Sequence, residues 1–101
     1  MKYLIIGRPG TVTIKLKHGA GLFQAAKDWV KAKLTDGTLD CHYGFADLGG
    51  FIIANADSHE KVQEMILDYP LYPFFVWEVA ALCDWEQTYD KNIEYFKKFA
   101  R

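Results

Sequence analysis

The most apolar segment of the chain is FFVWEVAAL at residues 74–82, in which Glu78 is the single charged residue. Successive side chains of a strand point to opposite faces of its sheet, and here both alternating sets are apolar apart from Glu78. Neither face of such a strand is suited to water. The segment therefore predicts a strand buried on both sides, in a sheet whose two faces both need a cover.

The residues before this segment predict a strand followed by a helix. Residues 2–7, KYLIIG, form a short apolar run that ends before a Pro-Gly turn, which is typical of a strand. Apolar residues recur at helical spacing over residues 22–34, and Gly37 is placed to end that helix. Between the two, residues 11–17 alternate in polarity, which fits either the return strand of a hairpin or a long connecting loop.

The middle of the chain predicts a hairpin and a second helix. Residues 39–46 alternate with a period of two, and a Gly-Gly turn leads into the apolar run of residues 51–54. Ser58 stands where the N-cap of a helix is expected, and the apolar stripe of residues 62–69 ends near Pro70. Residues 85–101 return to helical spacing, so we expect residues 86–101 to form a helical extension that folds over the core or onto a partner.

The predicted order is strand, helix, strand, strand, helix, strand, followed by an added helix. This order is that of a ferredoxin-like α+β domain with a four-stranded antiparallel sheet, and 101 residues are enough for one such domain. Both helices then cover one face of the sheet, and the apolar segment 74–82 requires that the other face is covered too. We expect a homodimer or higher homo-oligomer that pairs sheet against sheet, because symmetric dimers are the commonest oligomers. The alternative is that the carboxy-terminal helix covers this face within one chain.

Composition excludes several classes of partner. Twelve basic and thirteen acidic residues give a net charge of −1, so no global field attracts nucleic acid or anionic lipid. No segment has the length of a membrane span, and the first apolar run is too short for a signal peptide, so we expect a cytoplasmic protein.

Cys41 and Cys83 are isolated and are expected to be free thiols. His18 and His59 have no third ligand at metal-binding spacing, so no metal is expected.

Several local patterns resemble the muconolactone isomerase-like proteins. The strongest is YPLYPF at residues 69–74, followed by Trp77-Glu78-Val79 and Leu82, and the likeness extends from about Trp29 to Asp84. The weaker ones are Gly37-Thr38, Gly49-Gly50 and Ser58-His59-Glu60. The resemblance implies the dimeric α/β-barrel superfamily, in which ferredoxin-like chains pair through their sheets. Where the lactone isomerases carry Arg and His between tryptophans, this chain has LDCHYG at residues 39–44, which implies a relative rather than the lactone isomerase itself.

Two residues are candidates for catalysis. Glu78 is a carboxylate inside an apolar strand, an arrangement that costs several kcal/mol unless the group is paired or protonated. We predict that it is a general base that removes a proton beside a carbonyl group. The alternative is a structural ion pair or hydrogen bond, with Arg8 or His42 as the partner. His42 can exchange a proton near neutral pH or donate a hydrogen bond to a ligand, although it would also be an ordinary solvent-facing strand residue.

Aromatic residues are more numerous than a core of this size needs, and aromatic walls with few polar groups are typical of small-molecule pockets. The sequence thus predicts a cofactor-independent isomerase that acts by proton transfer on a small cyclic, lactone or aromatic compound. The alternative is a non-enzymatic protein, either ligand-binding or purely structural, whose aromatic excess forms interfaces. The residues expected to bind the substrate are Tyr43, Trp77, Phe75, Trp29 and Tyr72, with Arg8 as a polar contact.

Overall fold

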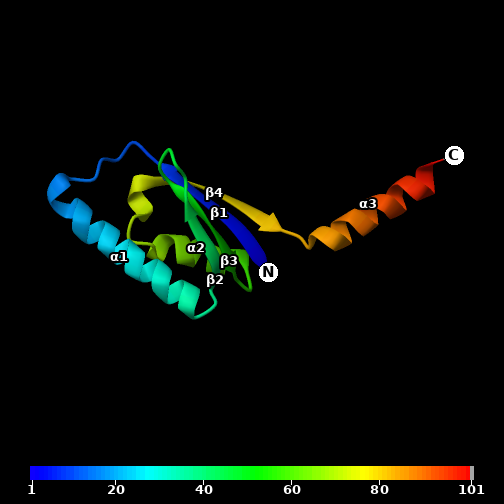
Figure 1. The fold of residues 1–101 in the computed structure, drawn as a ribbon, viewed down its shortest axis with the longest axis horizontal. Coiled ribbons are helices and arrows are strands. Elements are labelled where there is room, and N and C mark those ends of the chain that lie inside the picture. The colour runs from blue at the N-terminus through cyan, green and yellow to red at the C-terminus, as the bar shows by residue number, and fades with distance from the viewer. Residues whose placement is uncertain (101) are drawn as a thin grey trace.

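The structure is a computed structural model that describes residues 1–100, drawn as a ribbon in Figure 1. It confirms the predicted order of elements and their ferredoxin-like arrangement. The tight turn η1, Tyr72–Phe74, leads into the last strand. The strands and helices are β1 (Lys2–Pro9), α1 (Leu16–Thr35), β2 (Leu39–Gly44), β3 (Gly50–Asn55), α2 (His59–Asp68), β4 (Phe75–Leu82) and α3 (Trp85–Phe99).

The four strands form one antiparallel sheet in the order β2-β3-β1-β4, so that β2 and β4 are its edges. Tyr3 and Ile5 of β1 are almost fully buried and lie in one apolar cluster with Val30 of α1 and Val62 of α2. Both helices therefore cover the same face of the sheet, which we call the helix-facing side. Ser58 caps α2 as expected, because its hydroxyl accepts a hydrogen bond from the backbone N–H of Lys61 at 3.2 Å.

The other face of the sheet, which we call the outer sheet face, has no cover within the chain. Leu4 and Ile6 alternate with the buried residues of β1, so they point to this face. The strand register places Ile53 and Ala80 beside Leu4, on the neighbouring strands. The outer sheet face therefore combines apolar side chains from the centre of the sheet with the exposed residues of its edges. Its members are Leu4, Ile6, Cys41, Tyr43, Phe51, Ile53, Val76, Glu78, Ala80 and Leu82.

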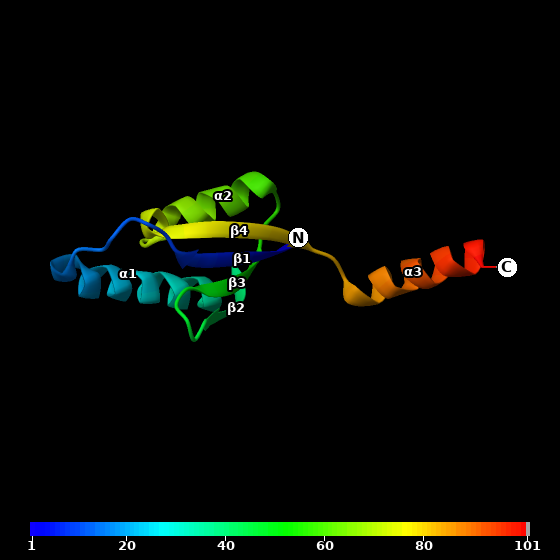
Figure 2. The same ribbon diagram turned by 90° about the horizontal axis from the view of Figure 1, so that it is seen from above.

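The carboxy-terminal helix α3 does not fold back over the sheet. Figures 1 and 2 show it projecting from the end of β4, apart from the sheet and from the other helices. The molecule is accordingly elongated, with a radius of gyration of 17.5 Å, whereas a compact domain of this length has a radius of about 13 Å. The alternative in which α3 covers the second face within one chain is wrong for this structure, and the outer sheet face stays exposed.

Residues 11–17 do not form the return strand that their alternating pattern allowed. They are an irregular connection, and α1 begins within them at Leu16. The physical reason is that β1 already has β3 on one side and β4 on the other, so a hairpin partner has no free edge to join. Within residues 1–100, none of the helices combines the length and the apolar character that crossing a membrane requires.

Candidate functional site

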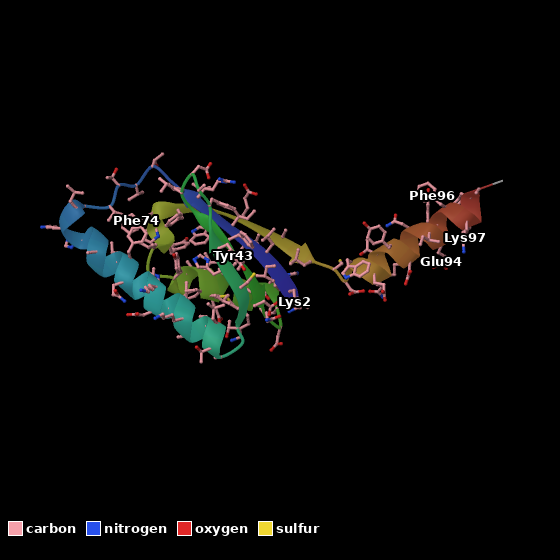
Figure 3. The ribbon with its side chains drawn as sticks, viewed as in Figure 1. Lys2, Tyr43, Phe74, Glu94, Phe96 and Lys97 are labelled. Carbon is pink, nitrogen blue, oxygen red and sulfur yellow. The ribbon has the colours of Figure 1, made fainter. Side chains whose placement is uncertain are left out.

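A cavity of about 550 Å³ lies between the helix-facing side of the sheet and α1. It occupies the end of the sheet where β1 finishes and β4 begins, beyond the apolar cluster around Tyr3 and Ile5. Phe74, labelled in Figure 3, is one of its lining residues and lies near the amino-terminal half of α1. The lining also includes Gly7, Trp29, His42, Gly44, Gly50, Tyr69, Phe75 and Trp77, together with Lys27 and Lys31 of α1.

A row of three glycines forms the floor of the cavity. Gly7 of β1 pairs with Gly50 of β3, which in turn pairs with Gly44 of β2, so the glycines lie side by side on three adjacent strands. Directly paired residues of antiparallel strands point to the same face, and this face is the helix-facing side. A row without side chains leaves an open space above the sheet. The missing side chains thus account for a cavity in a region that a packed core would otherwise fill.

The three glycines differ in what a side chain would meet. A Cβ atom at Gly7 would lie 2.9 Å from the ring of Trp77, and one at Gly50 would lie 2.6 Å from the carbonyl oxygen of Tyr43. Both distances are too short, so these two positions require glycine. At Gly44 the nearest atom would be 3.8 Å away, which is ordinary van der Waals contact. Gly44 is therefore the floor position where a side chain can be added into the cavity without a clash.

Four aromatic rings form a continuous wall of the cavity. Trp29 lies edge-on to Tyr69 with ring centres 5.2 Å apart, and Tyr69 lies edge-on to Trp77 at 5.6 Å. Phe75 extends the series, 5.8 Å from Trp77. Such edge-on and tilted contacts are favourable geometries for aromatic pairs. The wall comes from α1, the end of α2 and β4, so it links both layers of the fold.

The indole N–H groups of this wall are already used for hydrogen bonds. The Nε1 of Trp29 donates to Asp68 Oδ2 at 3.0 Å, and the Nε1 of Trp77 donates to the carbonyl oxygen of Tyr72 at 3.2 Å. These bonds fix the orientation of both rings. Burial raises the pKa of the Tyr69 phenol, because the charged phenolate is disfavoured away from water. Tyr69 therefore keeps its O–H at neutral pH as a possible donor to a ligand.

His42 lines the cavity because of an irregularity in β2. Leu39 pairs with Ala54 and Cys41 pairs with Ile53, so the edge strand contains one extra residue at this point. This β-bulge puts Leu39 and His42 on the helix-facing side and Tyr43 on the outer sheet face. Strict alternation along the sequence would instead put Leu39 and Tyr43 on the same side of the sheet.

A backbone hydrogen bond determines which nitrogen of His42 carries a proton. The ring Nδ1 lies 3.1 Å from the carbonyl oxygen of Phe51. A carbonyl oxygen only accepts, so Nδ1 must be the donor, and in the neutral ring Nε2 is left as the acceptor. His42 therefore presents the form of imidazole that can receive a proton from a ligand.

The structure brings together four of the eight predicted site residues. His42, Trp29, Phe75 and Trp77 all line the cavity. Tyr72 contributes only its carbonyl oxygen to this region, since its side chain lines a separate shallow groove on α2. In that groove the Tyr3 hydroxyl lies 2.9 Å from Nδ1 of His59.

The other three predicted residues point to the outer sheet face. Tyr43 stacks on Phe51 with ring centres 5.8 Å apart. The guanidinium of Arg8 lies 4.6 Å from the centre of the Phe45 ring and 3.9 Å from Asp47. Glu78 is exposed beside Ile6, and within residues 1–100 it forms no ion pair with Arg8 or His42, the two partners we considered. His42 and Glu78 thus lie on opposite edges and opposite sides of the sheet.

Sequence reasoning did not identify the glycine row, Tyr69 or the two lysines as site residues. Gly7 ends a predicted strand, Gly44 lies inside one and Gly50 belongs to a predicted turn, and their alignment depends on the strand register. Lys27 and Lys31 read only as a solvated helix face, yet they lie one turn apart on the part of α1 that borders the cavity. Among residues 1–100, no three His, Cys, Asp or Glu side chains gather as a metal site would require.

The fold and the cavity define an antiparallel α+β protein with a ligand-sized space beneath its helices. Comparison with solved structures identifies the fold more closely. The fold is that of muconolactone isomerase: a crystal structure of that enzyme matches with a TM-score of 0.74 and 19% sequence identity, covering 83% of this chain and 90% of the enzyme. A 5-chloro-2-hydroxyhydroquinone dehydrochlorinase from Burkholderia phenoliruptrix AC1100, in complex with 2,5-dihydroxybenzoquinone, matches with a TM-score of 0.66 and 16% identity, covering 86% of this chain and 98% of the dehydrochlorinase. The predicted muconolactone isomerase-like fold is thereby confirmed. Neither a family model nor a curated protein matches the sequence.

We predict that Gly44→Val narrows the cavity above the glycine row without unfolding the protein. Its Cβ meets no atom closer than 3.8 Å, and valine is well suited to a strand. The variant should keep the melting temperature of the wild type within a few degrees and take up indole, a small apolar probe of the cavity, more weakly than the wild type does, measured by isothermal titration calorimetry.

Gly21→Ala is the matched control, because a Cβ at Gly21 on α1 meets nothing within 4 Å and Gly21 does not line the cavity. Unchanged binding in Gly44→Val would show that the ligand site lies elsewhere.

Proposed function

We propose that the protein binds a small flat cyclic compound in the cavity and isomerises it by proton transfer without a cofactor. The observation that carries this proposal is the aromatic-walled space over the glycine row, with a histidine on its wall whose Nε2 is left as a proton acceptor. General bases of this kind must lie within reach of the proton they remove. His42 is the residue of the lining that meets this chemical requirement.

The dimensions and lining of the cavity support a ring-shaped ligand. Its volume of about 550 Å³ falls within the range of roughly 300–1,000 Å³ that is typical of small-molecule sites. The rings of Trp29 and Trp77 offer apolar surface, since both of their N–H groups already have partners. The dehydrochlorinase that shares this fold was crystallised with 2,5-dihydroxybenzoquinone, a flat six-membered ring, which supports the same shape of ligand here.

Lys27 and Lys31 favour a ligand that carries an acidic oxygen. Both lysines are exposed residues of α1 that border the cavity, so their ammonium groups can meet an anionic substituent at its rim. An aromatic acid, an acidic lactone or a hydroxyquinone would place its ring against the aromatic wall and its charge at this rim.

The proposed reaction moves one proton within the bound molecule. Nε2 of His42 removes a proton from a carbon next to a carbonyl group, and the electron pair of that C–H bond forms an enolate. The O–H of Tyr69 donates a hydrogen bond to the enolate oxygen, where the negative charge gathers. The protonated imidazole then returns the proton to another carbon of the conjugated system. The double bond has moved, no atom has been gained or lost, and His42 is neutral again.

We predict that His42→Gln abolishes proton exchange and keeps ligand binding. The probe is α-angelica lactone in D₂O, whose double bond shifts by this same proton transfer. Deuterium incorporation and formation of the conjugated isomer are followed by proton NMR. Removing a general base should slow both by about 10²-fold or more.

His18→Gln is the matched control, because His18 lies near the start of α1 and does not line the cavity. Exchange that persists in His42→Gln contradicts the role of His42. A wild-type protein that binds ring compounds but catalyses no exchange supports the alternative function, non-enzymatic ligand binding.

We further propose that the outer sheet face is buried against the same face of a second copy. Leu4, Ile6, Ile53 and Ala80 form a continuous apolar surface across three strands, and exposed apolar patches of this kind are typical of interaction sites. A two-fold pair would cover both surfaces at once. Apart from Glu78, the charged side chains lie at the margins, where Lys2 forms an ion pair with Asp40 and Arg8 approaches Asp47.

Glu78 would lie within this proposed contact. It sits beside Ile6 on the edge strand β4, and a carboxylate removed from water there needs a hydrogen-bonding partner. Such a partner would come from the second copy, since Glu78 has no ion pair within residues 1–100. A catalytic role for Glu78 stays a prediction that requires a separate site between the two sheets, because the cavity with His42 lies on the other side.

We predict that Ile53→Lys separates the copies. Ile53 lies on the outer sheet face between Leu4 and Cys41, so an ammonium group buried there has no carboxylate partner on the neighbouring strands, which is strongly unfavourable. At low micromolar concentration, sedimentation equilibrium should give an assembly for the wild type and the mass of one chain for the variant. Gln63→Lys, on the exposed surface of α2, is the control that adds the same charge elsewhere. A wild-type protein that sediments as one chain contradicts the proposed pairing.

A further inference from the structure

Helix α3 has a wide apolar face that no other element within residues 1–100 covers. Tyr89, Ile93, Phe96 and Phe99 are between 51% and 67% exposed. Figure 3 shows the side chains of α3, with Glu94, Phe96 and Lys97 labelled, standing clear of the sheet. The opposite side of the helix carries its charged residues, so α3 is amphipathic in isolation.

Such a helix needs a partner to be stable. It has 15 residues, and isolated helices of about 12–15 residues are only marginally stable in water. The Asp84 side chain caps its start by accepting a hydrogen bond from the Gln87 N–H at 2.8 Å, but a cap contributes only about 1 kcal/mol. Most of the stability of a helix comes from packing of its apolar face. The question is therefore which surface α3 packs against.

The spacing of its central residues is that of a helix pair. Trp85, Tyr89, Asn92, Phe96 and Phe99 follow one another at intervals of four, three, four and three residues. This is the heptad seam along which two helices interlock. The seam is apolar except at Asn92, which is the middle residue of α3. A single buried asparagine in such a seam typically fixes the register of the pair.

The charges of α3 favour an antiparallel pair. Acidic residues stand near its start, at Glu86 and Asp90, and basic residues near its end, at Lys97 and Lys98. When two copies run antiparallel and are centred on Asn92, the acidic first half of each helix runs alongside the basic last turn of the other. Between Trp85 and Phe99 the three acidic residues balance the three basic ones, so the helix has no net charge to attract an anionic membrane.

We propose that α3 pairs antiparallel with α3 of a second copy of this chain, with the two Asn92 side chains meeting at the two-fold axis. Asn92 donates one N–H to the carbonyl oxygen of Thr88 at 2.9 Å. Its second N–H and its Oδ1 are then available to form a reciprocal pair of hydrogen bonds with the other Asn92.

This contact is separate from both the cavity and the outer sheet face, and it holds whether or not the protein is an enzyme. A chain with two different self-contacts joins two different neighbours. Together with pairing through the outer sheet face, the α3 contact would therefore produce assemblies larger than a dimer, either closed or extended.

The experiment is site-specific cross-linking in the full-length chain. Cys41 and Cys83 are free thiols, so both are first replaced by serine. Single cysteines are then introduced as Asn92→Cys, Trp85→Cys and Gln87→Cys, and each protein is treated with a short bismaleimide at a concentration where the wild type is assembled. Circular dichroism checks that each variant keeps its fold, and denaturing electrophoresis measures the covalent dimer.

We expect Asn92→Cys to cross-link several-fold more than the other two variants. Gln87 lies on the polar side of α3, away from the seam. In an antiparallel pair the two Trp85 positions are seven residues from the centre on opposite ends, about 21 Å apart along the axis. Efficient cross-linking at Trp85→Cys would overturn the antiparallel arrangement in favour of a parallel one. Absence of cross-linking at Asn92→Cys in a folded protein would overturn α3 pairing altogether.

Discussion

A sheet that is apolar on both faces, in a chain whose helices cover only one of them, is the constraint on which the rest of this structure depends. Burial of Tyr3 and Ile5 against α1 and α2 forms the core of the chain. The alternate residues of the same strand, Leu4 and Ile6, are left on the outer sheet face. Apolar area exposed to water is unfavourable by roughly 25 cal/mol per Å². That face would therefore provide the driving force for the self-association that we propose.

On the covered side, the proposed function depends on the space that the core leaves unfilled. The side chains of Tyr3 and Ile5 fill one end of the space beneath the helices, whereas the row formed by Gly7, Gly50 and Gly44 leaves the other end empty. An apolar wall and a glycine floor by themselves would offer only binding contacts to a ring-shaped ligand. The β-bulge in β2 adds His42 to this lining and gives the site a group that can move a proton.

The sequence was sufficient for the fold because the fold depends on local patterns. The apolar segment 74–82 predicted β4, and Ser58 predicted the start of α2. The muconolactone isomerase-like resemblance, which included the YPLYPF segment, indicated the same fold that the comparison with solved structures shows. Each of these signals lies within a few consecutive residues, so it can be recognised without knowing which strands pair with one another.

The site was less predictable because it depends on register. One extra residue in β2 puts His42 on the helix-facing side and Tyr43 on the outer sheet face. No local sequence pattern indicates this extra residue. Glu78 stood out in the sequence because its strand is apolar, but the same strand order that makes β4 an edge leaves Glu78 exposed within one chain. The glycine row likewise exists only once three strands are aligned.

The space over the glycine row is the ligand site that we propose. Its most direct test is an NMR titration of ¹⁵N-labelled protein with 2,5-dihydroxybenzoquinone, observed through the backbone amides of the glycines. Binding in this space should cause saturable chemical-shift changes at Gly7, Gly44 and Gly50, with Gly21 and the amides of α3 unaffected. Changes confined to the outer sheet face or to α3, or no saturable change at all, would contradict it.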